Sequence, residues 1–98
     1  MIKLTSKQRR TLEKFAHDLR PVVIVGGSRI TDGVIQMVAS SLASHELIKV
    51  KFNEYKDEKS KLAREIEEQC DATLIRIIGN VAIFYKEAKN KKDRKYTF

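Results

Sequence analysis

Four β-branched residues, Val22-Val23-Ile24-Val25, stand between Pro21 and the pair Gly26-Gly27. β-branched side chains favour extended backbone, and proline and glycine punctuate both ends of the run. A short continuous apolar run is typical of a strand that is buried on both faces, as in parallel or mixed sheets. The run therefore predicts a strand that is buried on both faces.

A helix is predicted before this strand, over residues 6–18. Thr5-Ser6-Lys7-Gln8 fits a capping box, in which the Thr5 hydroxyl accepts from the Gln8 amide and the Gln8 side chain reaches back. A core stripe at helical spacing is expected to consist of Leu12, Phe15, Ala16 and Leu19. The helix ends before Pro21, because a residue that precedes proline disfavours helical backbone.

Helices and strands alternate over the rest of the chain. Further helices are expected over residues 31–44 and 57–70, the second one capped by Asp57, and strands over residues 47–52, 72–78 and 81–85. Gly79-Asn80 between the last two strands indicates a hairpin. The order α-β-α-β-α-β-β predicts a two-layer α/β fold, with one four-stranded mixed sheet packed against helices. We assign residues 1–86 to this domain and residues 87–98 to a loosely ordered basic tail.

The net charge of +7 is unevenly placed along the 98 residues. Residues 1–31 carry seven Lys and Arg against two Asp and Glu, residues 32–85 carry seven against nine, and residues 86–98 carry six against two. Clustered positive charge favours a polyanionic partner, because neutralised phosphates release condensed counterions. A surface charge that serves solubility alone is the open alternative.

The loop that follows the first strand is the most informative segment for function. Gly26 and Gly27 allow close backbone approach, and the next helix, beginning at about Thr31, turns its free amides toward the same space. Ser28 and Arg29 add donors. The loop matches neither the P-loop nor the Rossmann glycine pattern, so it predicts a site for nucleic-acid backbone phosphate. A purely structural strand-to-helix turn is the alternative reading.

Further cations accompany this loop. Four of them lie off the core stripe of the first helix and are expected to face solvent, and two alternate with apolar residues on the second strand. The tail adds Lys86, Lys89, Lys91, Lys92, Arg94 and Lys95. The residues expected to contact a nucleic-acid backbone are Lys7, Arg9, Arg10, Lys14, Gly26, Gly27, Ser28, Arg29, Thr31, Lys49 and Lys51.

Other classes of function find little support in the sequence. Cys70 is the sole cysteine and is expected in the core, while His17 and His45 lie near helix ends without a nucleophile or ligand set. We therefore expect a non-enzymatic protein with no metal, no cofactor and no small-molecule substrate. Apolar stretches are far shorter than a membrane span, and the first residues lack the apolar core of a secretory signal. We expect a cytoplasmic monomer with no membrane partner.

Several segments together match one family. They are Leu4-Thr5-Ser6-Lys7-Gln8, Pro21 to Gly26, Ile30-Thr31-Asp32-Gly33-Val34, His45 to Lys51, Ile78-Gly79-Asn80 and Phe84-Tyr85. Between residues 4 and 85 the chain thus resembles the YhbY-type CRM (chloroplast RNA splicing and ribosome maturation) domain. The resemblance implies a fold similar to the C-terminal domain of translation initiation factor three. It also implies RNA binding through a G-x-x-G loop and association with precursors of the large ribosomal subunit.

One loop position departs from the family pattern. Gly26 matches the first loop glycine, but Arg29 stands where a second glycine usually closes the loop. Arginine is costly at positive φ. We therefore expect Gly27 to take the strained conformation and Arg29 to contact a phosphate.

The leading hypothesis is a ribosome-assembly factor that binds ribosomal RNA of the large-subunit precursor through the glycine-rich loop and the basic helix face. The salt slope is the gradient of the logarithm of the binding constant against the logarithm of the salt concentration. About five phosphate contacts predict a salt slope of about −3.5, at roughly 0.7 per phosphate for single strands. The alternative is a protein-interaction adaptor that docks on a ribosomal protein. Its contact surface would be the acidic third helix, with Asp57, Glu58, Glu65, Glu67 and Glu68.

Overall fold

The computed structural model describes residues 2–96. In chain order the elements are α1 (Ser6–Ala16), β1 (Val23–Val25), α2 (Asp32–His45), β2 (Leu47–Phe52), the 3-10 turn η1 (Lys56–Glu58), α3 (Lys59–Cys70), β3 (Thr73–Ile78), β4 (Val81–Tyr85) and the 3-10 turn η2 (Lys91–Asp93). The predicted α/β class, element order and four-stranded mixed sheet are confirmed. The capping box at Thr5 and Gln8 is present as expected, with both of its hydrogen bonds.

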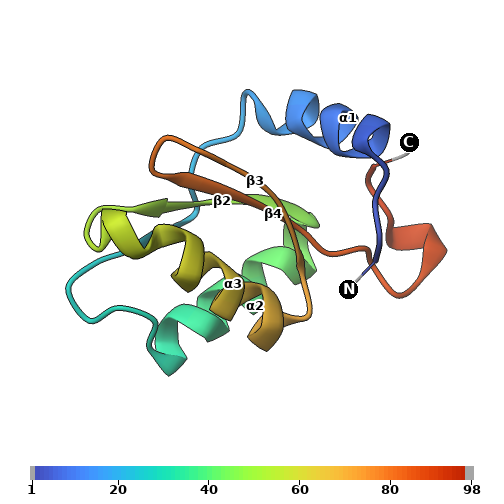
Figure 1. The fold of residues 1–98 in the computed structure, drawn as a ribbon. Helices are drawn as coiled ribbons and strands as arrows, with labels where there is room; N and C mark the ends of the chain where they lie inside the picture. The colour runs from blue at the N-terminus through green and yellow to red at the C-terminus, as the bar shows by residue number, and fades with distance from the viewer. Residues whose placement is uncertain (1, 97–98) are drawn as a thin grey trace.

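The four strands lie in the order β1-β2-β4-β3. β1 is parallel to β2, and β4 is antiparallel to both of its neighbours (Figure 1). The hairpin turns at Gly79, whose φ of 60° lies in the left-handed region that glycine adopts freely. β1 and β3 are therefore the edge strands, and β2 and β4 form the middle of the sheet.

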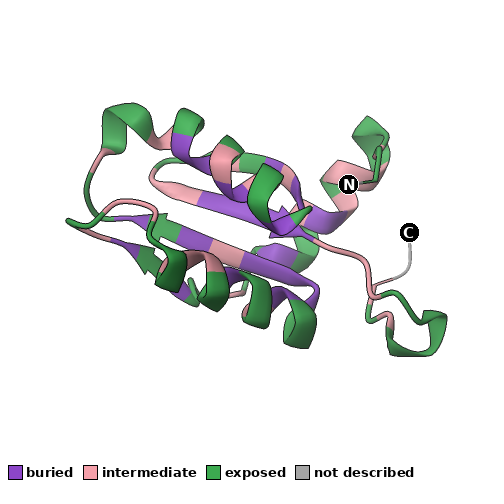
Figure 2. Ribbon diagram, turned by 90° about the horizontal axis from the view of Figure 1, so that it is seen from below, coloured by how far each residue is buried: buried purple, intermediate pink, exposed green. Residues whose placement is uncertain are grey.

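Helices cover both faces of the sheet, which refines the expected two-layer arrangement. α2 and α3 pack on one face around a core that includes Val50, Phe52 and Phe84 (Figures 1 and 2). α1 packs on the other face through Leu12 and Ala16. It contacts the strand side chains that alternate with the core residues and point to this second face. The sheet is thus a middle layer, and α1 covers only one end of its second face.

Two expectations about burial are wrong. β1 buries Val23 and Val25 but exposes Ile24, so this strand is buried on one face, because α1 does not extend over the sheet edge. Phe15 is exposed rather than in the core stripe, and its ring lies 5.2 Å from that of Tyr96. A continuous apolar run therefore does not by itself indicate two covered faces.

The start of α3 also differs from the prediction. Asp57 lies inside η1, and α3 begins at Lys59 with no side-chain cap at Glu58. Tyr55, just before η1, has a φ of 57°. This left-handed residue turns the chain sharply after β2 and brings the turn up against the loop that follows β1.

The C-terminal segment, residues 86–96, packs on the domain, contrary to the expected loose tail. The buried carboxylate of Glu46 accepts from the backbone amides of Ala88, at 2.6 Å, and Lys95. Tyr96 packs on the cluster formed by α1, β3 and β4. Residues 97–98 of the predicted tail lie outside the described residues.

Candidate nucleic-acid interface

The glycine-rich loop forms a tight turn at the end of β1. The Arg29 amide donates to the Gly26 carbonyl at 3.1 Å, and Gly27 and Ser28 lie exposed between them. Arg29 itself has a φ of 60°, whereas neither Gly26 nor Gly27 has a positive φ. The expectation that Gly27 carries the strained conformation is wrong. Arginine therefore occupies the left-handed position of this turn.

The turn η1 and the residues before it hold this loop in place. The Tyr55 hydroxyl donates to the Gly27 carbonyl at 2.6 Å. The Arg29 guanidinium lies 5.1 Å from the centre of the Tyr55 ring and 3.2 Å from a Glu58 carboxylate oxygen. A Cβ added at Gly27 would meet a Glu54 carboxylate oxygen at 3.0 Å, so a larger residue there would require a small shift of the exposed Glu54 side chain. These contacts give the loop a fixed shape, with a partner already beside Arg29.

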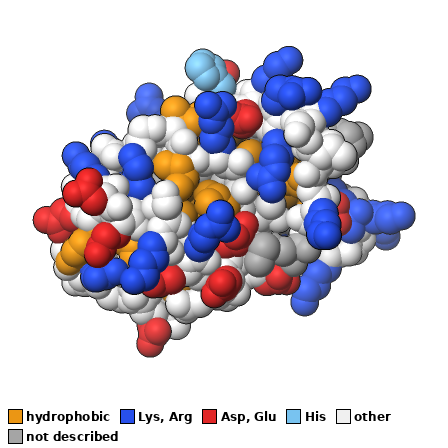
Figure 3. Space-filling model, in the orientation of Figure 1, with side chains coloured by type: hydrophobic (Ala, Val, Ile, Leu, Met, Phe, Trp, Pro, Cys, Tyr) orange, Lys and Arg blue, Asp and Glu red, His pale blue; other side chains and the backbone are white. Residues whose placement is uncertain are grey.

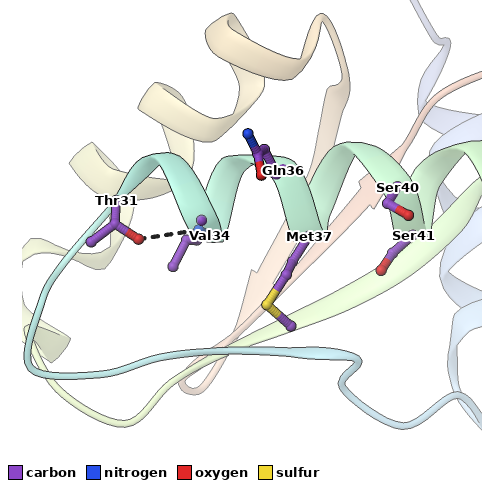
Figure 4. Close-up of a pocket in the computed structure, with 7 residues that line it drawn as sticks. Thr31, Val34, Gln36, Met37, Ser40 and Ser41 are labelled. Atoms are coloured by element: carbon purple, nitrogen blue, oxygen red, sulfur yellow. Dashed lines mark hydrogen bonds between the residues drawn. The ribbon is translucent and has the colours of Figure 1, made fainter.

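Thr31 and Asp32 occupy the start of α2. The Thr31 hydroxyl accepts from the Val34 amide at 3.1 Å, which makes Thr31 the N-cap (Figure 4). Asp32 already places a carboxylate in the first turn, where it interacts favourably with the helix dipole. The start of α2 is therefore a weaker anion site than the sequence suggests. The backbone amides of the loop before it are more accessible to a phosphate.

The basic face of α1 contains three free cations and one that is engaged. Lys7, Arg10 and Lys14 are exposed as predicted. Arg9 is half-buried, and its Nη1 donates to the carbonyls of Leu74, at 2.9 Å, and Ile75, at 3.1 Å. Those carbonyls lie at an irregularity in the β3–β4 register. Arg9 does not point to solvent as expected, because it binds the carbonyls that the bulge leaves available.

The two lysines of β2 also differ from each other. Lys49 is half-buried, and its ammonium donates to the His17 carbonyl at 3.2 Å, at the end of α1. Lys51 is exposed. Both lysines point to the sheet face that α1 partly covers, because Val50 and Phe52 point to the core on the other face.

The loop and the cations of α1 lie at different ends of the sheet. The loop follows Val25, which pairs with Phe52 at the end of β2, whereas α1 packs on Leu47 at the beginning of β2. Five residues of strand separate these positions by roughly 17 Å. The structure therefore does not gather the predicted site into one pocket, and the face of the sheet lies between its two parts (Figure 1).

Basic and acidic side chains are partly segregated on the surface. On the face shown in Figure 3, Lys and Arg are frequent along the upper part, over α1, and most Asp and Glu lie below, over the helices of the other layer. Two of the tail cations have structural partners: Lys86 donates to the Cys70 carbonyl at 2.8 Å, and Arg94 pairs with Glu87 at 2.9 Å. The exposed tail cations are Lys89, Lys91, Lys92 and Lys95.

Other kinds of site were sought in the described part of the chain. Residues 2–96 contain no group of three or more His, Cys, Asp or Glu side chains placed to hold a metal ion. Cys70 is buried in the core as predicted, and this burial raises the pKa of its thiol. A shallow hollow runs along the outer side of α2, past Met37 and Ser41 (Figure 4). No helix in this part of the chain is long and apolar enough to cross a membrane.

Sequence reasoning missed Tyr55 and Glu58 as residues of this site. Tyr55 lies in what reads as a polar connection, and Glu58 reads as one of the acidic residues at the start of the third helix, so no motif marks either for this site. Their role depends on the left-handed backbone at Tyr55, which turns the connection toward the loop. The one signal in the sequence is the glycine pair, because glycine allows another segment of the chain to approach the loop closely.

Comparison with known proteins places the chain among sequences of similar length. The domain model described as CRS1 / YhbY (CRM) matches residues 4–86. The chain is 36% identical over 90 residues to a Bacillus subtilis protein named "Probable RNA-binding protein YqeI", covering 91% of this chain and 94% of that protein. It is 33% identical over 93 residues to a Haemophilus influenzae protein named "RNA-binding protein", covering 94% of each. The solution structure of the hypothetical protein SAV1595 from Staphylococcus aureus superimposes with a TM-score of 0.79 at 31% identity, over 97% of this chain and all of that one.

Proposed function

Because the chain belongs to the CRS1/YhbY (CRM) domain family, we propose that it binds RNA and acts in ribosome assembly, on ribosomal RNA of the large-subunit precursor. The names of the relatives in Bacillus and Haemophilus support the first part of this proposal. The observation that carries it is the exposed, pre-shaped turn from Gly26 to Arg29, which presents backbone amides and a guanidinium at the end of a sheet face lined by cations. We propose that the protein acts in the cytoplasm as a monomer.

Phosphate contacts supply most of the affinity in this proposal. Of the cations predicted to contact RNA, four are exposed and have no ion pair among the described residues, namely Lys7, Arg10, Lys14 and Lys51. A fifth, Arg29, shares its charge with Glu58. Five cations at roughly 0.7 per phosphate give a log–log salt slope of about −3.5. Arg9 and Lys49 contribute indirectly, because they bind carbonyls that join α1 to the sheet.

A neutralising triple variant tests whether these particular cations bind the phosphates. In Arg10→Gln/Lys14→Gln/Lys51→Gln, two of the five contacts remain, so the slope should fall to about −1.4 and the affinity for a large-subunit ribosomal RNA fragment should drop. Arg9 is left unchanged, because its loss would disturb β3. Fluorescence anisotropy over a series of salt concentrations measures both quantities.

The matched control removes three positive charges on the other side of the molecule. Lys61 and Arg64 lie exposed on α3, and Lys89 lies exposed beside α2, so replacing these three with Gln changes the net charge by the same amount. This control should keep a slope of about −3.5. An equal drop in both variants would show that net charge alone drives binding, and would contradict the proposed surface.

RNA crosslinking in cells tests the finer part of the proposal. Crosslinks should map to ribosomal RNA in precursors of the large subunit and should disappear in the triple variant. If particle association survives in that variant, the protein-adaptor alternative is favoured. Its acidic surface would be smaller than expected, because Glu58 binds Arg29 and Glu67 accepts from the Leu74 amide at 2.6 Å.

A further inference from the structure

A row of four side chains crosses the open face of the sheet, one from each strand. Ile24 pairs with Lys51, Lys51 pairs with Val81, and Val81 pairs with Ile78. We call these four residues the outer row. Paired residues on neighbouring strands point to the same face, and this face is opposite the core that α2 and α3 cover.

The outer row is exposed because α1 ends short of it. Ile24 and Ile78 are 56% and 53% exposed, Lys51 is exposed and Val81 is half-buried. Neighbouring strands lie about 4.8 Å apart, so the row is roughly 14 Å long. Val22, also exposed, extends the apolar surface along β1. Large aliphatic side chains that lie on both sides of Lys51 on one open sheet face indicate a contact surface rather than scattered surface residues.

The charges around the row are positive. Lys51 lies within it, and Lys49 and Arg76 occupy the next row toward α1. The carboxylate of Glu13, on α1, binds Arg76 at 2.9 Å and so has a partner already. A surface that is both apolar and cationic fits a ligand with flat apolar faces joined by anionic groups.

The outer row also adjoins the glycine-rich loop. Ile24 is two residues before Gly26, and Ile78 directly precedes the hairpin turn at Gly79. The row and the loop therefore lie at the same end of the sheet, and a single polymer chain can contact both. In a duplex the base faces are stacked and hidden, whereas in an unpaired segment they can pack on protein side chains.

We propose that the outer row packs against the faces of unpaired RNA bases, while the loop and the neighbouring cations bind the phosphates of the same segment. This inference rests on the proposed function and names the class of RNA that the surface selects. The row distinguishes single-stranded from paired RNA without hydrogen bonds to base edges. Recognition of this kind is tolerant of sequence, because every base has a flat face.

The test uses a variant that removes apolar surface and keeps charge. In Ile24→Thr/Ile78→Thr, threonine retains a high preference for strands. Affinity for a single-stranded RNA oligonucleotide should fall about tenfold, whereas affinity for a fully paired RNA hairpin of the same length should not change. The salt slope should be unchanged, because no cation is removed. Met37→Thr, at a residue 53% exposed on α2, is the matched control and should bind both RNAs like the wild type.

A second variant keeps the proposal testable if the threonine variant folds poorly. Ile24→Phe adds an aromatic ring to the row and should strengthen single-strand binding. The inference is wrong if neither variant changes single-strand affinity, or if threonine weakens binding to both RNAs equally. It is also wrong if the wild-type protein self-associates in sedimentation through this row. If the wild-type protein binds neither RNA, the proposed function itself fails, and that result is distinct from the others.

Discussion

The strain at Arg29 can be measured with two substitutions that lose the same contacts. Left-handed backbone costs a residue with a Cβ roughly 1–2 kcal/mol, and Arg29 has a φ of 60°. Arg29→Ala and Arg29→Gly both remove the guanidinium from Glu58 and Tyr55, but only the glycine variant releases the strain. The difference between the two variants therefore isolates the backbone.

The expected difference follows from two opposing effects. Against the strain relief of roughly 1–2 kcal/mol, glycine adds freedom to the unfolded chain, which costs about 0.5–1 kcal/mol. With central values of about 1.5 and 0.75 kcal/mol for the two effects, Arg29→Gly should be about 0.75 kcal/mol more stable than Arg29→Ala. For a domain of this size that corresponds to a gap of roughly 3–6 °C in Tm. The ion pair between Arg29 and Glu58 contributes little to the stability of the wild-type protein, because the two side chains are 43% and 45% exposed.

Thermal and urea unfolding of the two variants measure this gap. The same pair of substitutions at Ser28 is the control, because Ser28 has no positive φ and the order should reverse there, with alanine more stable by about 0.4–1 kcal/mol. RNA binding should weaken equally in both Arg29 variants, since both lose the charge. If Arg29→Ala proves as stable as Arg29→Gly, the left-handed turn is not a strained position and the reasoning fails.

Three further predictions concern the contacts that hold the domain together. Arg9→Leu should lower the free energy of unfolding by about 2–3 kcal/mol, because two partly buried carbonyls lose a charged donor. Arg10→Leu should change it by less than about 0.5 kcal/mol, and urea titration measures both. Glu46→Gln should speed amide hydrogen exchange in residues 87–96, because one amide oxygen replaces a carboxylate that accepts from two backbone amides. Burial raises the pKa of Tyr85 from 10 to about 12. The neutral phenol of Tyr85 therefore contributes fully to stability below pH 10, and this contribution is lost as the pH rises to about 12. That loss should reach roughly 2–3 kcal/mol in the wild-type protein and should be absent in Tyr85→Phe, when the two are compared by chemical unfolding across that range.

Local signals in the sequence were enough for most of the fold. The capping box at Thr5, the N-cap at Thr31 and the turn at Gly79 each depend on a few neighbouring residues, and all three are present. The four strands follow from short apolar runs separated by helices. Such features are readable because the backbone conformation is set by residues close in sequence.

The missed features all depend on contacts between distant segments. Arg9 reads as one more cation on a basic helix, and only the bulge in β3 gives its guanidinium two carbonyls to bind. Glu46 reads as a turn residue, and its burial follows from the amides that the C-terminal segment brings to it. The exposure of Ile24 likewise depends on where α1 ends. None of these outcomes follows from spacing or composition.

The placement of α1 also sets an order of events during synthesis. This helix is made first, yet its apolar side packs on Ile75, Ile83 and Tyr85, and its Phe15 ring meets Tyr96 near the end of the chain. The nascent helix is too short to be stable alone and has no surface to dock on until the hairpin has left the exit tunnel. Native packing of this eleven-residue helix therefore follows synthesis of the hairpin, and until then its apolar stripe is open to chaperones.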